Sequence, residues 1–317
     1  MHPALSVILF TTLSGAGYGL LGWLGFFGTI GLLPLDPMFG AVSMILVLGV
    51  ISAGLISSTF HLGHPERAWR AFSQWRSSWL SREGVASTVT YGPALVFGVG
   101  WVVFRDTTGP WLLSGILSFV CAAGTVACTA YIYRSLKPIP AWSNRWVVPN
   151  YLSLSAMTGA LWLAAVSSLF GYRLYGLGIT ALLSIALALV LKLAYWRFID
   201  GNPGTSTAES ATGLGFLGKV TLLEAPHTSE NYLLKEMGFR IARKHAQKLR
   251  RIAFGLGFLV PFALAMIAIL ASGVLVPLCW LLAAAIAMIG VLVERWLFFA
   301  EAKHTVTLYY GRDLGPS

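Results

Sequence analysis

Long runs of apolar residues dominate the chain, and short polar stretches separate them. A helix needs about 20 predominantly apolar residues to cross the hydrocarbon core of a bilayer. By this measure the sequence predicts eight membrane-spanning helices, at residues 5–30, 38–60, 84–104, 110–133, 149–170, 174–197, 252–273 and 276–299. We therefore expect an all-α integral membrane protein whose fold is an eight-transmembrane-helix bundle.

The overall composition agrees with a membrane protein. Hydrophobic residues make up 56% of the 317 residues and charged residues 11%, whereas soluble domains have about 45–50% and about 25%. No internal repeat of short period divides the sequence. We expect residues 1–317 to form a single polytopic membrane domain with one long cytoplasmic loop at 199–251.

The distribution of positive charge predicts the orientation. Of the 22 Lys and Arg residues, only Arg105 and Arg173 fall on the face opposite to the termini and the long loops. Because cytoplasmic loops carry the excess of Lys and Arg, both termini are expected in the cytoplasm. An excess confined to one membrane face is explained by topology, so we expect the membrane lipid as a partner and no nucleic acid.

The segment between the second and third predicted helices is unusually rich in ionisable groups. It holds His61, His64, Glu66, Arg67, Arg70, Arg76, Arg82 and Glu83. Ionisable groups gathered at one membrane face are typical of sites that handle protons or electrons. An ordinary interfacial segment, with arginines on lipid phosphates and tryptophans at headgroup level, also explains the arginines and tryptophans. It explains His61 and Glu83 less well.

Two observations limit the cofactors that the protein itself can bind. Its cysteines, Cys121, Cys128 and Cys279, form no C-x-x-C pair, so we expect no iron–sulfur cluster and no metal site in this protein. None of the six histidines lies in the middle of a predicted helix. A haem held by two histidines inside the bundle is therefore not expected.

Three charged residues lie inside predicted helices. Lys192 can extend its ammonium group toward the membrane surface, and Glu294 and Arg295 can pair with a neighbouring helix. Structural pairing is favoured over a functional role, but the sequence leaves the roles of all three open.

Several separated motifs resemble the membrane anchor subunit of dimethyl sulfoxide reductase, the DmsC family. In the ionisable segment the motif is Thr59-Phe60-His61-Leu62-Gly63, followed by Pro65, Arg67 and Ser81-Arg82-Glu83. Elsewhere the motifs are Met1-His2-Pro3-Ala4-Leu5-Ser6-Val7, Ile139-Pro140-Ala141-Trp142, Glu224-Ala225-Pro226-His227-Thr228 and Glu236-Met237-Gly238-Phe239. The resemblance extends over essentially the whole sequence.

The resemblance implies a haem-free, quinone-reactive anchor in the bacterial inner membrane. Such an anchor exchanges electrons between menaquinone or ubiquinone and a docked iron–sulfur subunit, which connects to a catalytic subunit with a molybdopterin cofactor. The residues that match the family's quinone site are His61, Arg67 and Glu83. Histidine titrates near neutral pH, so His61 is expected to bind a quinone oxygen, Glu83 to relay protons and Arg67 to give electrostatic support. His64 is near enough to contribute weakly.

The predicted orientation also bears on the reaction. An iron–sulfur subunit must dock close to the quinone site, which places it and the catalytic subunit on the cytoplasmic face. This arrangement favours the anchor of a cytoplasmic sulfite-oxidising molybdoenzyme, with a dimethyl sulfoxide reductase anchor that oxidises menaquinol as the alternative. A small-solute transporter is the alternative from another class, but transporters place polar groups near the midplane, and here they gather at one end.

Overall fold

The computed structural model describes residues 5–60, 62, 64–202, 206–224, 245–305 and 308, and the described part contains helices and no strand. Eight of its helical spans are long and apolar enough to cross a membrane, which confirms the predicted fold class. The spans are α1 (Leu5–Thr29), α2 (Pro37–Thr59), α3 (Trp79–Val99) continued by the π-helix η2 (Gly100–Phe104), α4 (Gly109–Arg134), α5 (Val147–Leu169), α6 (Tyr175–Gly201), α10 (Ala246–Phe254) continued by η4 (Gly255–Leu259) and α11 (Val260–Leu270), and α12 (Leu275–Ala300). Shorter elements are η1 (Pro65–Phe72), α7 (Ala208–Thr212) and η3 (Gly215–Leu217).

Some helices extend further than their apolar runs predict. The third span begins at Trp79 and not at residue 84, because the Ser78 side chain accepts a hydrogen bond from the backbone of Ser81 and caps the helix. The sixth span continues to Gly201, so the long connection is 202–245 and not 199–251. Polar residues remain helical where a helix emerges into water, and hydropathy alone does not show this. Glu83 consequently lies within a helix.

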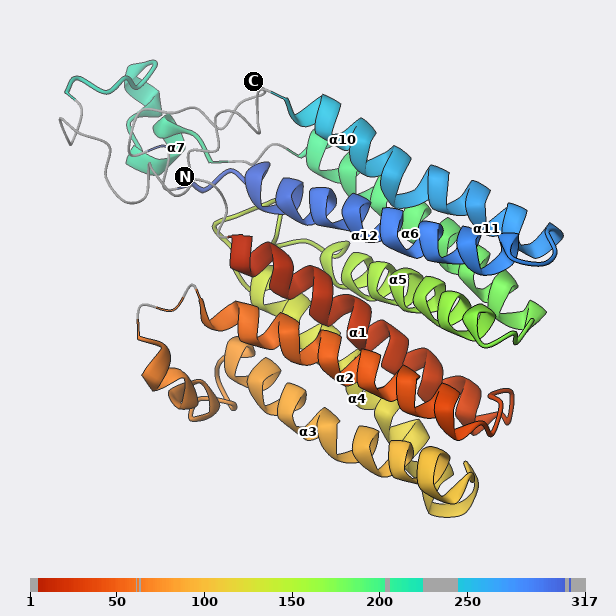
Figure 1. Ribbon diagram of the computed structural model, residues 1–317. Coiled ribbons are helices and arrows are strands. Elements are labelled where there is room, and N and C mark those ends of the chain that lie inside the picture. Colours follow the sequence, from red (N-terminus) through yellow and green to blue (C-terminus); the bar gives the residue numbers. More distant parts are fainter. Residues whose placement is uncertain are drawn as a thin grey trace.

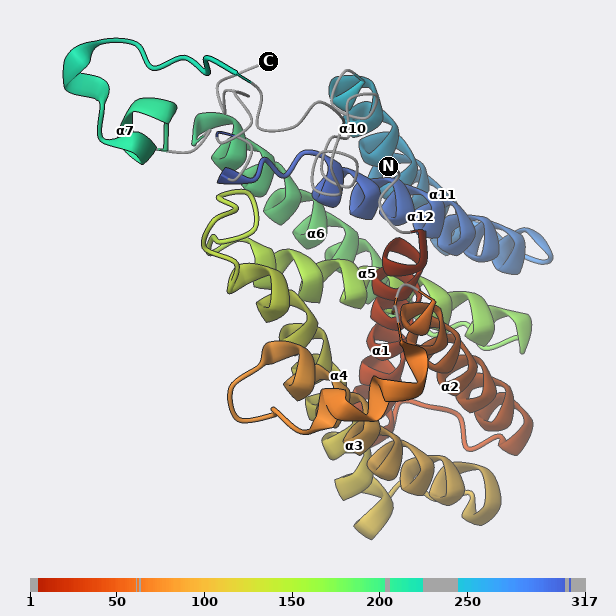
Figure 2. The same ribbon diagram turned by 90° about the vertical axis from the view of Figure 1, so that its left-hand side faces the viewer.

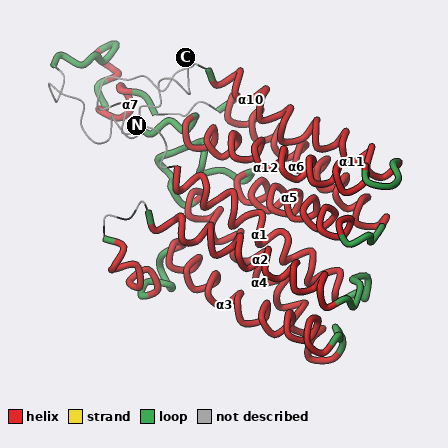
Figure 3. The backbone as a smooth tube through the Cα atoms, in the orientation of Figure 1, coloured by secondary structure: helices red, strands yellow, loops and turns green. Residues whose placement is uncertain are grey.

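The long helices run side by side as one bundle (Figure 1). Longer connecting segments lie at one end of the bundle and short connections at the other. We call one end the loop end: it carries η1, α7 and the connection between α4 and α5. The other end, the turn end, carries the short connections that include Arg105 and Arg173. Seen from the side, α1 lies inside the bundle, and it contacts α2, α4, α5 and α12 (Figure 2). The backbone trace shows that the membrane-spanning part of the bundle consists of helices joined by loops (Figure 3).

Glycines allow α1 and α5 to approach closely at the centre of the bundle. A Cβ atom on Gly19 would lie 1.8 Å from the Ser155 carbonyl oxygen, and one on Gly159 would lie 2.1 Å from the Gly19 backbone. The same relation joins α12 to the seventh span, where a Cβ on Gly290 would lie 2.1 Å from Gly257. Small residues let helices pack backbone to backbone in membranes, where hydrophobic burial between helices contributes little. These contacts therefore fix the order of the central helices.

At the turn end, Asp36 joins two connections. Its Oδ1 accepts a hydrogen bond from Met38 N at 2.8 Å, which caps α2, and its Oδ2 accepts one from the Tyr172 hydroxyl at 2.9 Å. The hydrogen bond from Tyr172, with the backbone bond from Met38, holds the pKa of Asp36 below its ordinary value.

This lowered pKa predicts a pH-dependent contribution to stability. A carboxyl whose pKa is lower in the folded state contributes above its unfolded value, about 3.9, and loses the contribution as the pH falls through the folded pKa. Thermal unfolding at pH 7 is therefore expected to show Asp36→Asn as less stable than the wild type. At pH 3 the difference should shrink, and an equal difference at both pH values would contradict this account.

Candidate functional site

The sequence-predicted residue Glu83 lies in the first turns of α3, inside the bundle near the loop end. Its side chain is only 5% exposed. The hydroxyl of Thr129 on α4 donates a short hydrogen bond to its Oε1, and none of the described side chains forms an ion pair with it. A buried carboxyl without a counter-ion is expensive in a membrane and is typical of functional sites. It is suited to taking up and releasing a proton.

Two other predicted residues, His64 and Arg67, lie on the surface of the loop end. Glu66 joins them: its Oε1 is 2.9 Å from His64 Nδ1 and 3.7 Å from Arg67 Nε. The side chains of these three residues are 55–66% exposed. The structure thus pairs Arg67 with Glu66 and not with Glu83. His61 lies outside the described residues.

The rest of the ionisable segment folds back over the start of α3. Arg82 donates hydrogen bonds to the carbonyl oxygens of Trp75 and Arg76 at 3.0 and 2.7 Å. Its guanidinium group lies 4.3 Å from the ring centroid of Trp79, and that ring stacks on Tyr131 of α4 at 4.4 Å. Trp69 and Trp75 remain exposed, as expected of residues at the membrane surface. These contacts hold the loop beside the helix turn that carries Glu83.

A small cavity lies further inside, between α1, α4, α5 and α12. Eight of its 14 lining residues carry a hydroxyl, among them Thr12, Tyr18, Thr129 and Tyr151, and Arg295 also lines it. Thr129 therefore contacts this cavity while it donates its hydrogen bond to Glu83. A second cavity lies near Arg173 at the turn end. Of these two cavities, only the first is lined by a hydrogen-bond partner of the buried acid.

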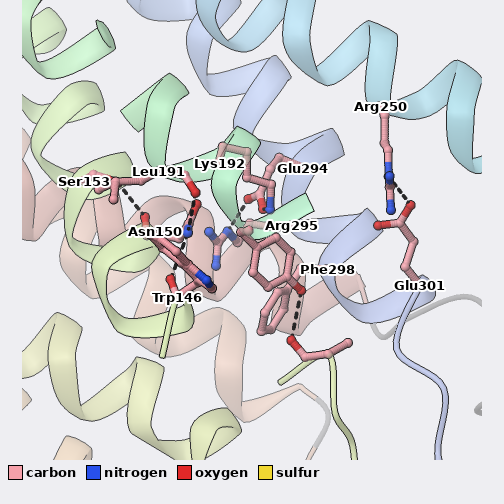
Figure 4. A network of polar contacts seen from close by, with 12 residues as sticks. Trp146, Asn150, Ser153, Leu191, Lys192, Arg250, Glu294, Arg295, Phe298 and Glu301 are labelled. Carbon is pink, nitrogen blue, oxygen red and sulfur yellow. Dashed lines mark hydrogen bonds and ion pairs between the residues drawn. The ribbon is translucent and has the colours of Figure 1, made fainter. Parts of the chain in front are cut away.

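The charged residues inside α6 and α12 form one buried cluster (Figure 4). Lys192 Nζ donates a short hydrogen bond to Glu294 Oε1, and Arg295 Nε lies 2.7 Å from Glu294 Oε2. The Arg295 guanidinium also lies 3.9 Å from the ring centroid of Tyr151. Lys192 is 1% exposed, so its extension toward the surface is wrong, whereas the expected pairing of Glu294 with a neighbouring helix is confirmed. The Lys192 ammonium group turns inward because Glu294 offers it an acceptor.

A second ion-pair group ties three helices together at the loop end. Arg250 of α10 contacts Asp200 of α6 through two hydrogen bonds of 2.7 and 2.9 Å. It contacts Glu301, after α12, through one hydrogen bond of 2.7 Å (Figure 4). Burial raises the pKa of Glu301, and the charge of Arg250 opposes this effect. This group stabilises the loop end beside the buried cluster.

Among the described residues, no group of three or more His, Cys, Asp and Glu side chains is placed to hold a metal ion. Glu83 and Thr129 instead place a hydrogen-bonded carboxyl and hydroxyl near the loop end of α3 and α4. Helix α3 exposes apolar side chains such as Leu80 and Val89 to its surroundings, and an apolar tail can pack on such a surface.

The fold and the site together define a multi-pass membrane protein with a buried acid near one face. A family model narrows this class: residues 1–311 match the model described as DMSO reductase anchor subunit (DmsC). The chain belongs to this family, and it is therefore a membrane subunit of an oxidoreductase complex.

Two curated relatives agree with the family. The protein is 33% identical over 329 aligned positions to the C subunit of sulfite dehydrogenase from Allochromatium vinosum, an alignment that spans 98% of this protein and 99% of the relative. It is 27% identical over 161 positions to the C chain of anaerobic dimethyl sulfoxide reductase from Escherichia coli, which spans 49% of this protein and 52% of the relative. No solved structure matches the sequence.

Sequence reasoning missed the hydroxyl residues around Glu83. Thr129 lies within an apolar run and has no distinguishing neighbour in the sequence. The same is true of Thr12 and Tyr18. One available signal was the spacing of Thr125 and Thr129, which places two hydroxyls on the same face of α4. What they face depends on the contact between α3 and α4, and the sequence pattern does not contain that information.

Proposed function

We propose that this protein is the haem-free, quinone-reactive membrane anchor of a molybdopterin and iron–sulfur oxidoreductase complex. It exchanges electrons between quinone in the bilayer and a docked iron–sulfur subunit, with menaquinone and ubiquinone both suitable. The observation that carries the proposal is Glu83, a carboxyl buried at the loop end with a hydroxyl partner and no ion pair among the described residues. The family supports the task.

A quinone supplies two-electron chemistry that is coupled to the uptake or release of two protons. The protein's own residues have three tasks. Glu83 gives or takes a proton at its carboxyl, and Thr129 fixes the orientation of that carboxyl through its hydrogen bond. His61 binds a quinone oxygen, and Arg67 lends positive charge at the mouth of the site, with His64 beside it. Arg67 Nε lies 3.7 Å from Glu66 Oε1, so Arg67 has to leave Glu66 before it can approach Glu83.

The partners belong at the loop end. Electron transfer needs a short distance, so the iron–sulfur subunit docks next to the ionisable segment, and the molybdopterin subunit docks beyond it. The excess of Lys and Arg on this face supports a location in the cytoplasm of a bacterium, with the anchor in the inner membrane. Arg250 hydrogen-bonds Asp200 of α6 and Glu301 after α12, and these contacts stabilise the end of the bundle on which we propose that the partner docks.

Sulfite is the substrate that the relatives favour. The match to a sulfite dehydrogenase subunit runs along nearly the whole sequence, whereas the match to a dimethyl sulfoxide reductase subunit extends over about half of it. Electrons would then flow from sulfite to quinone. A menaquinol-oxidising dimethyl sulfoxide reductase anchor is the second candidate.

Transport of a small solute is the alternative from another class. A transporter needs a binding site near the midplane that opens to both sides. Here the charged side chains buried among the described residues, Glu83, Lys192, Glu294 and Arg295, all belong to the loop-end half of their helices. This one-sided placement favours the anchor.

The test compares two activities of the purified complex. Glu83→Gln keeps the shape of the side chain and removes its titratable group. Its quinone-linked turnover is expected to fall by about 100-fold or more, as is usual when a general acid–base group is lost. Turnover with a soluble dye that accepts electrons from the iron–sulfur subunit should remain, because that route bypasses the membrane site.

The matched control is Glu209→Gln, the same chemical change in α7 of the long connection. It should keep both activities. Wild-type quinone turnover in Glu83→Gln would overturn the proposal, and so would a complex without molybdenum or iron–sulfur clusters among its copurifying subunits.

A further inference from the structure

The cavity between α1, α4, α5 and α12 is lined by Thr129, which hydrogen-bonds Glu83, and by Arg295, which pairs with Glu294 in the buried cluster. We infer that it holds ordered water, and that this water links Glu83 to a second proton store, the Lys192–Glu294 pair. The role in turnover rests on the proposed function. The presence of water does not.

The first argument is the number of polar atoms left without a well-aligned partner at this cavity. The Thr12 hydroxyl and the Nη1 of Arg295 have no hydrogen-bond partner in the described structure, and the hydroxyls of Tyr18 and Tyr151 have only poorly aligned contacts, with Ser87 and with Arg295. The exposed fractions are 3% for Thr12 and Tyr18, 5% for Tyr151 and 2% for Arg295. Buried polar groups are nearly always satisfied, and an orphaned one costs several kcal/mol in an apolar medium. One shared space beside all four points to one shared partner.

The second argument is the size and chemistry of that space. About 20 Å³ of it is open to the centre of a water molecule, and roughly 10–15 Å³ is enough to hold one. Eight of the 14 lining residues carry a hydroxyl, which both donates and accepts hydrogen bonds, so the polar part of the wall offers partners for a water molecule.

The third argument is the charge of the cluster at the far side. Lys192 and Arg295 bring two positive charges and Glu294 one negative charge, so the cluster carries a net charge of +1 while its members are at most 2% exposed. An uncompensated charge in a low-dielectric interior is costly. Loss of one proton from Lys192 leaves the neutral pair of Glu294 and Arg295. The cluster is therefore built to give up one proton and to take it back.

The series of transfers balances in protons. Glu83 gives its carboxyl proton to the quinone site and regains one from the Thr129 hydroxyl, which takes one from the cavity water. Lys192 replaces that proton in two transfers: its N–H bond breaks as the proton passes to Glu294 across their hydrogen bond, and Glu294 passes it on to the water beside Arg295. Arg295 orients the water without changing its own charge. Two titratable groups on either side of one water thus match the two protons of quinone chemistry. In the opposite direction of electron flow each transfer reverses.

The presence of water has a test that needs no turnover. The complex in lipid nanodiscs is exposed to X-ray-generated hydroxyl radicals, which arise from water beside a side chain. Tyr18 and Tyr151 should be modified several-fold faster than Tyr195, which is equally buried at 2% exposure but donates its hydroxyl to the Ala141 carbonyl away from the cavity. Equal modification rates for all three tyrosines would overturn the inference that the cavity holds water.

The relay is tested with Lys192→Met and Tyr18→Phe. Both should slow quinone-linked turnover several-fold and increase its solvent deuterium isotope effect, while dye-linked turnover stays unchanged. Tyr91→Phe is the control, because its hydroxyl bonds Ser52 at 2.7 Å outside the cavity, and it should behave as wild type. If both variants behave as wild type while Glu83→Gln is inactive, the relay is wrong and the proposed function stands. A fully active Glu83→Gln would overturn the proposed function and the relay, and would leave only the water.

Discussion

Glu294→Ala is expected to destabilise the folded bundle by about 3–5 kcal/mol, the usual effect of removing one partner from a buried ion pair. The carboxylate is the only acidic member of its cluster, and it contacts both Lys192 and Arg295 directly. Its loss leaves two cations in an interior that water barely reaches. The measurement is thermal or denaturant unfolding of the complex in detergent.

The sign of the effect depends on which member of the cluster is removed. Lys192→Met leaves the neutral Glu294–Arg295 pair and fills the volume with an apolar side chain, and such replacements are often neutral or stabilising. The double variant Lys192→Met/Glu294→Gln leaves Arg295 as the single buried cation, so its net charge of +1 equals that of the native cluster. It should be more stable than Glu294→Ala, which leaves two buried cations. Wild-type stability in Glu294→Ala would contradict the buried pairing.

Gly159→Leu is expected to prevent the close contact of α1 and α5. A Cβ at this position would lie 2.1 Å from the carbonyl carbon of Gly19, and the obstacle is backbone that cannot rotate away. Overpacking of a flexible core costs about 1–3 kcal/mol, and a rigid backbone clash at the central helix should exceed that range. The expected result is loss of the monodisperse complex in size-exclusion chromatography.

The control for this variant is Gly124→Leu. Gly124 lies within α4, and a Cβ there would meet nothing within 4 Å. The substitution should leave assembly and activity unchanged. If Gly159→Leu assembled as well as Gly124→Leu, the close contact of α1 and α5 would be wrong.

Hydropathy predicted the spanning helices well, because each one is a continuous apolar run. Where a helix ends is set by capping and by tertiary contacts, so Trp79 and Gly201 were not predicted as helix ends. The family resemblance also implied that Arg67 and Glu83 share one site. In the structure Arg67 remains exposed beside Glu66, since a short surface segment satisfies its charges locally.

The buried partners were the hardest to predict. Glu83 was identified as important, but its bond to Thr129 and the cavity behind it depend on how α1, α3, α4 and α5 pack. Lys192 was expected to reach the surface because a lone lysine in an apolar helix usually does so. Its actual direction depends on Glu294, which lies far along the sequence. A pattern within one helix does not contain such information.

The confinement of the buried charges to the loop-end half has a bioenergetic consequence. In the other half, side chains such as Leu161, Ala268 and Ala283 pack into an apolar cluster, and no charged side chain among the described residues is buried there. On the proposed function, protons exchanged at Glu83 enter and leave through the loop end, where we propose that the electron-transfer partner docks. Electrons and protons would then move on the same side of the membrane, and turnover would be electroneutral. Such an enzyme supplies or consumes quinol for the respiratory chain without itself generating a membrane potential.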